Sequence, residues 1–283
     1  MVSDLHCGST LGLCPPEVTV EGGGTYHAND VQRWLWASWE DATGCRWKPD
    51  RAGGHFVTMP DRQGWIRKLA KRRKCGLIIN GDCIEGLHHH SVEVIGADEL
   101  LHERIAETIL APLAEFFDTT FVIRGTECHV GVRESALGLK LGARYDKATK
   151  CFCYEQLQLR IRDTLCHFKH HIGSSMRPWT SSMQFAAALS SEQLNAIGLD
   201  HKEVPRVICR AHRHQYGEFR NNQGLIVVSP PWQMLTRFAR RVTQASLAQP
   251  GLFALDFRDL DSYGLPRVHA KLYRPDADEV ITL

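Results

Sequence analysis

Carboxylate and imidazole side chains recur at the ends of apolar segments in this chain, and their spacing suits metal binding. Asp4 and His6 are two residues apart, which places both on one side of an extended segment. His212 and His214 repeat this spacing with two imidazoles, and Asp82 directly follows a glycine at the end of an apolar run. Carboxylates and imidazoles without a thiolate suit Mn, Fe, Zn, Co or Ni.

Two further polar clusters follow apolar segments, namely Thr126, Glu127 and His129, and then His170 and His171. Ligands collect at the carboxyl ends of strands in open α/β sheets, so we expect these clusters to meet. Six or seven such ligands are too many for one tetrahedral ion. They suit two ions about 3.5–4 Å apart, the usual geometry for phosphate ester hydrolysis.

The elements that must position these residues can be read from apolar patterns. Helices are expected over residues 30–42, 61–74, 97–117, 133–145 and 181–196, and strands over 75–80, 119–123, 155–160, 163–168 and 206–209. Residues 8–28 and 44–60 are expected to be irregular, and the part after 214 is expected to be mostly strand with a turn at Asn221–Asn222. The early part alternates strands with helices and the later part is antiparallel in character.

Composition narrows the class of protein. The chain has 283 residues, 43% hydrophobic, with a net charge of +2, so we expect a globular protein whose charge alone implies neither nucleic acid nor membrane. Two basic clusters, RKLAKRRK (67–74) and RFARR (237–241), are interpreted as solvated helix faces in preference to a polyanion-binding rim. His88 to His90 suit a substrate contact and a solvated loop equally well.

Ten cysteines without a CxxC pair indicate small buried side chains in a reducing compartment. The start of the chain does not look like a signal peptide, and no apolar run reaches transmembrane length. We therefore expect a soluble cytoplasmic protein that makes no use of a membrane.

The order of the polar pieces resembles the calcineurin-like metallophosphoesterases. The pieces are SDLH (3–6), GDCIEG (81–86), RGTECH (124–129), FKHHIG (168–173) and RAHRH (210–214). RGTECHVG and KHHIGSS are similar to phage- and prophage-encoded members. The resemblance implies an α/β fold, a four-layer α/β/β/α sandwich of two mixed sheets with a dinuclear metal site at the strand ends. Residues 1–283 would form a single domain, in which the motifs span 3–214 and residues 215–283 complete the second sheet.

The resemblance also implies roles for the residues. One ion would take Asp4, His6 and His214, the other would take His212 and His171 or His170, and Asp82 would bridge them. His129 would act at the phosphoryl oxygens or the leaving group. The cofactors would be two divalent transition-metal ions, with manganese favoured and Fe, Zn, Co or Ni as alternatives. Glu85 is expected to accept a hydrogen bond that orients a ligand.

Two features depart from the family pattern. The third motif is usually G-N-H, whereas this chain has Gly-Thr-Glu-Cys-His, so either Thr126 or Glu127 replaces the asparagine or this ligand is missing. Glu127 is favoured because a carboxylate binds these cations more strongly than a hydroxyl does. Only two apolar residues, Met1 and Val2, stand before the SDLH piece, so either the first strand is cropped or the native start lies upstream.

The expected function is hydrolysis of a phosphomonoester or phosphodiester by attack of a metal-bridging hydroxide. The substrate is a phosphate ester, and the enzyme is a phosphatase, a phosphodiesterase or a nuclease that processes nucleic-acid ends. The alternative is a non-catalytic scaffold with a degraded site. The sequence leaves the substrate and the oligomeric state open.

Overall fold

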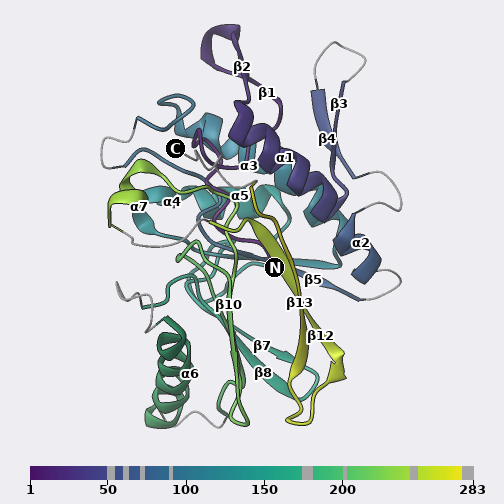
Figure 1. The fold of residues 1–283 in the computed structure, drawn as a ribbon, viewed down its shortest axis with the longest axis vertical. Coiled ribbons are helices and arrows are strands. Elements are labelled where there is room, and N and C mark those ends of the chain that lie inside the picture. The colour runs from purple at the N-terminus through teal and green to yellow at the C-terminus, as the bar shows by residue number, and fades with distance from the viewer. Residues whose placement is uncertain are drawn as a thin grey trace, which may run out of the picture.

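The computed structural model of the protein describes residues 1–49, 55–59, 64–70, 74–88, 92–173, 181–199, 203–242 and 248–275. The fold is α/β with mixed sheets (Figure 1). The helices are α1 (Asp30–Thr43), α2 (Trp65–Ala70), α3 (Glu99–Phe116), α4 (Glu127–Val130), α5 (Arg133–Lys140), α6 (Ser181–Gly198) and α7 (Arg237–Val242), with a 3₁₀ turn η1 (Glu21–Gly23).

The strands number thirteen in the described residues. They are β1 (Glu17–Thr19), β2 (Thr25–His27), β3 (Arg46–Pro49), β4 (His55–Thr58), β5 (Gly76–Asn80), β6 (Thr119–Ile123), β7 (Leu157–Ile161), β8 (Thr164–Phe168), β9 (Val207–Arg210), β10 (Gly217–Arg220), β11 (Leu225–Val228), β12 (Gly251–Leu260) and β13 (Pro266–Leu272).

The largest sheet has the order β10-β11-β9-β8-β7. Its central strand β9 is parallel to both β8 and β11, whereas the two outer pairs are antiparallel. Strands β5 and β6 form a separate parallel pair. The start of the chain lies between β5 and β12, because Val2 bridges Ile79 and Met1 exchanges backbone hydrogen bonds with Phe253. The first strand is thus reduced to a single bridge.

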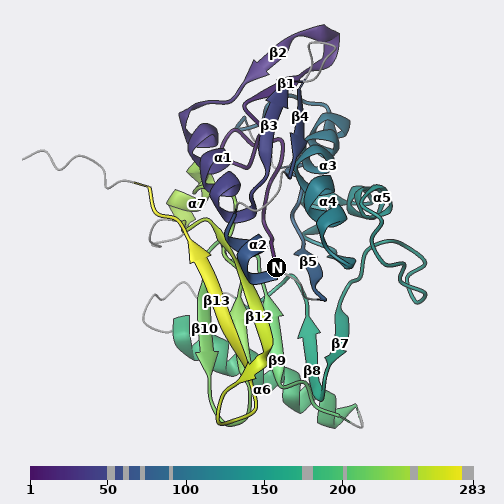
Figure 2. The same ribbon diagram turned by 90° about the vertical axis from the view of Figure 1, so that its right-hand side faces the viewer.

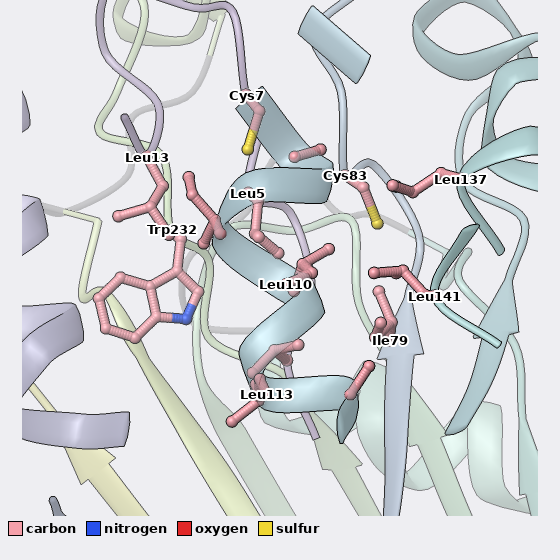
Figure 3. Packing of buried hydrophobic residues seen from close by; sticks show 14 of the residues in the cluster. Leu5, Cys7, Leu13, Ile79, Cys83, Leu110, Leu113, Leu137, Leu141 and Trp232 are labelled. Atoms are coloured by element: carbon pink, nitrogen blue, oxygen red, sulfur yellow. The ribbon is translucent and has the colours of Figure 1, made fainter. Parts of the chain in front are cut away.

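Three groups of buried side chains hold these elements together. The first joins α1 and α3 to β5 and the loops around it, and Figure 3 shows Leu110 and Leu113 of α3 beside Ile79 and Cys83. The second lies between the β5–β6 pair, the five-stranded sheet and β12. The third lies between α6 and the strands β9, β10 and β11, at the lower end of the molecule in Figure 2.

The long helices follow closely from their caps. Asn29 accepts a hydrogen bond from the backbone of Gln32, whose side chain accepts one from Asn29 in return, so α1 begins in a capping box. Asp98 caps α3 in a similar way. The tryptophans of α1 serve mainly in packing, since Trp36 and Trp39 are buried.

The structure corrects two expectations about elements and describes a third only in part. The segments predicted to be irregular contain two hairpins, β1–β2 and β3–β4, whose strands have only three or four residues. The part after residue 214 contains the helix α7. The basic helix predicted at 61–74 is described only over α2, and residues 61–63 and 71–73 lie outside the described part.

All ten cysteines are free thiols. Among the helices of the described part, none combines the length and the apolar character that crossing a membrane requires.

Candidate metal centre

The predicted ligands share an unusual backbone conformation. Among the described residues, seven other than glycine have a positive φ angle, and five of them are predicted ligands. These five are Asp4 (φ 51°), His6 (46°), Asp82 (50°), His212 (71°) and His214 (51°). A left-handed backbone costs an ordinary residue roughly 1–3 kcal/mol and persists only where the surroundings impose it, as at functional sites. The backbone conformation at these five residues is therefore imposed by their surroundings, as expected where side chains must point towards a common site.

Asp4, His6 and His214 form the first group of ligand atoms. The Nε2 atoms of His6 and His214 lie 3.1 Å apart, and Nε2 of His214 lies 3.5 Å from Oδ1 of Asp4. Two nitrogens bound to one ion at about 2.0–2.1 Å are themselves roughly 2.9–3.4 Å apart. The spacing of the two imidazoles thus fits a shared metal ion.

His170, His171 and His212 form the second group. The ring centroids of His171 and His212 are 4.7 Å apart, and those of His170 and His212 are 5.3 Å apart. His170 is fully buried and donates a hydrogen bond from Nδ1 to the carbonyl of Asn80 at 2.7 Å. His171 is exposed. The structure brings both candidate histidines to the group, and His170 has the fixed ring orientation that metal ligands usually have.

Asp82 lies between the two groups. Its Oδ2 atom is 3.9 Å from Nε2 of His6 and 3.9 Å from Nδ1 of His212, and it forms an ion pair of 3.0 Å with Nε2 of His170. Burial opposes ionisation of Asp82, but the charges and hydrogen bonds of these histidines outweigh it and hold its pKa well below the usual range. The side chain is therefore a buried carboxylate with imidazoles on both sides.

Burial and neighbouring charges also have opposing effects on the pKa values of His170 and Asp4. Burial opposes the charge of His170, but the carboxylates of Asp82 and Asp4 raise its pKa to about 10. Burial also disfavours the charged form of Asp4, and the hydrogen bond and charge of His214, with the charge of His170, lower its pKa. The carboxylates of Asp4 and Asp82 thus stay ionised and His170 keeps its proton, because each charge stabilises the others.

Glu85 orients His6, as predicted. Its Oε2 atom accepts hydrogen bonds from Nδ1 of His6 at 2.7 Å and from Nε2 of Gln233 at 3.1 Å. Its Oε1 atom accepts one from His88 at 3.0 Å. Because the Nδ1 proton of His6 is engaged by this carboxylate, Nε2 is the atom left to face His214.

His129 lies beside the first group. Its Nδ1 atom donates to the carbonyl of Glu85 at 2.8 Å, and its ring is 4.8 Å from that of His6 and 4.0 Å from that of His88. Burial and the charge of His6 lower the pKa of His129 to about 4. The ring is therefore neutral at pH 7, with Nε2 as its remaining proton acceptor. His89 and His90 lie outside the described residues.

Thr126 and Glu127 are placed differently. The backbone amide of Thr126 donates to Oδ1 of Asp82 at 2.6 Å, and its Oγ1 lies 3.1 Å from both Oδ2 of Asp82 and Nδ1 of His212. Glu127 is the first residue of α4, and its side chain is exposed. Among the described residues, Glu127 is absent from all four groups of side chains able to share a metal ion. The structure thus brings Thr126, rather than Glu127, to the centre.

Two residues of the site were missed by the sequence reasoning, Gln233 and Glu134. Glu134 is fully buried in α5 and accepts hydrogen bonds from the backbone of the loops after β5 and β6. Burial and the neighbouring charge of Asp82 raise its pKa to about 7. Neither residue could be recognised from its spacing to a ligand motif in the sequence, because each reaches the site from a segment that carries no predicted ligand.

Comparisons with known proteins give weak similarities. No protein-family model and no curated protein matches the chain. Among solved structures, it is similar to Vps29 from Chaetomium thermophilum, with 13% identity, a TM-score of 0.36 and coverage of 76% of this chain and 90% of the other.

A Zn²⁺ complex of Vps29 from Entamoeba histolytica gives 13% identity, a TM-score of 0.34 and coverage of 70% and 98%. A predicted phosphoesterase from Streptococcus pneumoniae gives 10% identity, a TM-score of 0.31 and coverage of 73% and 87%. At these values the chemistry must be argued from the residues of the chain itself. Those residues show an α/β protein with His, Asp and Glu clusters able to hold divalent metal.

Proposed function

We propose that the protein is a dinuclear metal-dependent phosphoesterase of the calcineurin-like class. The observation that carries this proposal is the position of Asp82, whose Oδ2 atom lies within 3.9 Å of imidazole nitrogens from both ligand groups, His6 of the first and His170 and His212 of the second. A carboxylate shared between two sets of nitrogen and oxygen ligands suits a pair of ions.

The residues fit these ions in chemistry and in spacing. Asp4, His6 and His214 would hold one ion, His212 and His170 the other, with His171 as the alternative to His170, and Asp82 would be shared. Thr126 would stand where an asparagine ligand is usual. Two bound divalent cations would supply Lewis acidity, which acidifies water and offsets the charge of phosphoryl oxygens. Mn²⁺ is the first ion to test because imidazole and carboxylate ligands suit it.

His129 has the position of the proton-transferring group. Its Nδ1–H is engaged by the carbonyl of Glu85, so Nε2 is the atom that can meet a substrate. The ring is neutral at pH 7, and a phosphate anion beside it would raise its pKa. The ring would then take up a proton from solvent as the substrate binds and would donate it to the leaving-group oxygen as the ester bond to phosphorus breaks.

The architecture follows from the three buried clusters. A layered arrangement is supported by their positions: the first lies between α1, α3 and β5, the second between the β5–β6 pair, the five-stranded sheet and β12, and the third between α6 and β9 to β11. We therefore infer a four-layer α/β/β/α sandwich that forms a single domain over residues 1–283. Within it, β10 to β13 complete the sheets around the second and third clusters.

The test combines metal content with activity. Elemental analysis at saturating Mn²⁺ is expected to give two ions per chain. Phosphomonoesters, phosphodiesters and single- and double-stranded DNA then identify the substrate class.

Asp82→Asn is expected to retain less than a tenth of the activity, a loss above about 1.4 kcal/mol, with the fold intact by circular dichroism. Asp163→Asn in the exposed β7–β8 turn is the control and is expected to be unchanged. At most one bound ion would refute the dinuclear site.

A second candidate is a scaffold that needs no metal. It is supported by the hydrogen bonds of Asp82, which accepts from Thr126 and pairs with His170, so this carboxylate has partners within the protein itself. A scaffold would purify without stoichiometric metal, would bind none when Mn²⁺ is added and would be inactive on every substrate.

A further inference from the structure

Glu134 joins two loops of the metal centre. It is the second residue of α5, and its side chain is fully buried. Its Oε1 atom accepts a hydrogen bond from the amide of Cys83 at 3.0 Å, and its Oε2 atom accepts one from the amide of Gly125 at 2.6 Å. Cys83 directly follows Asp82, and Gly125 directly precedes Thr126. One carboxylate therefore contacts both loops, one residue away from each side chain that faces the metal centre.

The two loops are packed without spare room. A Cβ atom on Gly125 would lie 2.2 Å from both the amide nitrogen and Oδ1 of Asp82. The amide of Thr126, the next residue, donates to the same Oδ1 at 2.6 Å. A small change in the spacing of the loops would therefore break this contact or move the carboxylate of Asp82 relative to the imidazoles.

We propose that Glu134 is a positioning residue of the metal centre, which fixes the loop of Asp82 against the loop of Thr126 and so sets the geometry of the shared ligand. This inference rests on the proposed function. A carboxylate is suited to the task because it is an acceptor at both oxygens, and both backbone groups that face it are donors. A glutamine would turn its own N–H donor towards one of them. The backbone amide facing this donor would then be buried without a hydrogen-bond acceptor.

The test compares Glu134→Gln with the wild type in two measurements. Titration calorimetry with Mn²⁺ is expected to show affinity lower by about ten- to a hundredfold, the usual effect of losing a group that orients a metal ligand. Hydrogen exchange of the metal-free protein is expected to be about tenfold faster at the amide of Cys83 or Gly125, because one of the two hydrogen bonds is lost.

The matched control is Asp118→Asn. Asp118 also accepts a backbone amide across the β5–β6 pair, from Cys75 at 2.8 Å, but at the opposite end of the strands. This variant makes the same acid-to-amide change between the same two strands and is expected to bind Mn²⁺ like the wild type. If Glu134→Gln does not fold, Glu134→Asp keeps an acceptor-only carboxylate, is too short to reach both amides and is expected to lower Mn²⁺ affinity in the same way.

The outcomes are distinct. Wild-type Mn²⁺ affinity in a folded Glu134 variant overturns the positioning role, even if its melting temperature falls, because a purely structural residue would behave in that way. A wild-type protein that binds no Mn²⁺ refutes the proposed function instead. In that case the exchange of the Cys83 and Gly125 amides still decides whether Glu134 holds the loops, and unchanged exchange overturns this too.

Discussion

His129 differs from the other histidines of the centre in its role. Its ring is held by a backbone carbonyl rather than by a carboxylate, and its pKa is lowered to about 4, whereas that of His170 is raised to about 10. The ring is therefore available for proton transfer, while His170 is committed to Asp82. In the metal-free protein these two histidines thus have opposite protonation states at pH 7 because their surroundings differ, and His170 must lose the proton on Nε2 to bind a metal ion.

Replacing His129 by alanine is expected to lower turnover by roughly 100-fold, the lower end of the range for a proton-transferring group. Metal occupancy, measured by elemental analysis, should stay near that of the wild type. His27→Ala is the control, because that side chain is 70% exposed and lies in the β1–β2 hairpin. Loss of one ion together with near-normal turnover at high Mn²⁺ would make His129 a ligand.

Thr126 and Glu127 are the two candidates for the ligand that replaces the usual asparagine, and the structure favours Thr126. Thr126→Ala removes the hydroxyl that lies 3.1 Å from Asp82 and from His212, so it is expected to weaken the second ion by about tenfold or more. Glu127→Gln changes an exposed side chain and is expected to leave Mn²⁺ affinity and the pH–rate profile unchanged. The reverse result, in a Mn²⁺ titration of both variants, would restore Glu127 as the ligand.

At the level of residues, the types and the order of the polar side chains were enough to predict most of the metal ligands. They were not enough to predict which way the chain turns after Gly125. The sequence placed Asp4, Asp82 and His214 at strand ends, and the structure brings them together. It favoured Glu127 over Thr126 on charge alone. The helix α4 begins at Glu127 and turns that side chain outwards, and a helix of four residues has too little periodicity to be recognised in a sequence.

At the level of elements, predictions held where a cap or a long apolar pattern existed. The helix predicted over residues 30–42 begins at the observed first residue of α1 and ends one residue early, and β6 was predicted with its observed bounds. The hairpins β1–β2 and β3–β4 were missed, because three or four residues give almost no alternation to detect. Their pairing is decided by the fold around them.

The helix α6 is fixed to the five-stranded sheet by a polar cluster as well as by apolar contacts. Arg210 of β9 is buried, and it pairs with Glu192 of α6 at 2.7 Å. Glu192 also lies 3.2 Å from Nδ1 of His167. The hydrogen bond from His167 and the charge of Arg210 lower the pKa of Glu192 to about 2. Removing this carboxylate would leave a buried guanidinium without its partner.

Glu192 therefore predicts a pH-dependent contribution to stability. Because its folded pKa is depressed, the contribution is complete above the ordinary carboxyl pKa and is lost as the pH falls towards about 2. Urea unfolding is expected to show Glu192→Gln about 1–2 kcal/mol less stable than the wild type at pH 7, with a smaller difference at pH 3. Glu203→Gln removes an exposed partner of Arg160 and should change little at either pH. A difference that grows towards low pH would contradict this account.

At the level of the whole molecule, the site depends on contacts between distant parts of the chain. Asp4 accepts a hydrogen bond from the backbone of His212, across a separation of 208 residues, and His6 meets His214 across the same separation. Sequence patterns indicated that these residues end strands. They did not indicate which strands are neighbours, because sheet order is set by the packing of the three clusters.

Metal binding should therefore stabilise the whole fold, since the ligands come from segments as far apart in the chain as Asp4 and His214. At a free Mn²⁺ concentration of 100 times Kd, each ion adds about 2.7 kcal/mol. Two ions would raise the melting temperature by roughly 10 °C at about 2 °C per kcal/mol. Scanning calorimetry with Mn²⁺ and then with excess EDTA measures this shift. Asp82→Asn should keep less than half of it, because Asp82 is shared, whereas His129→Ala should keep nearly all. Equal shifts in all three proteins would show that the ions bind elsewhere.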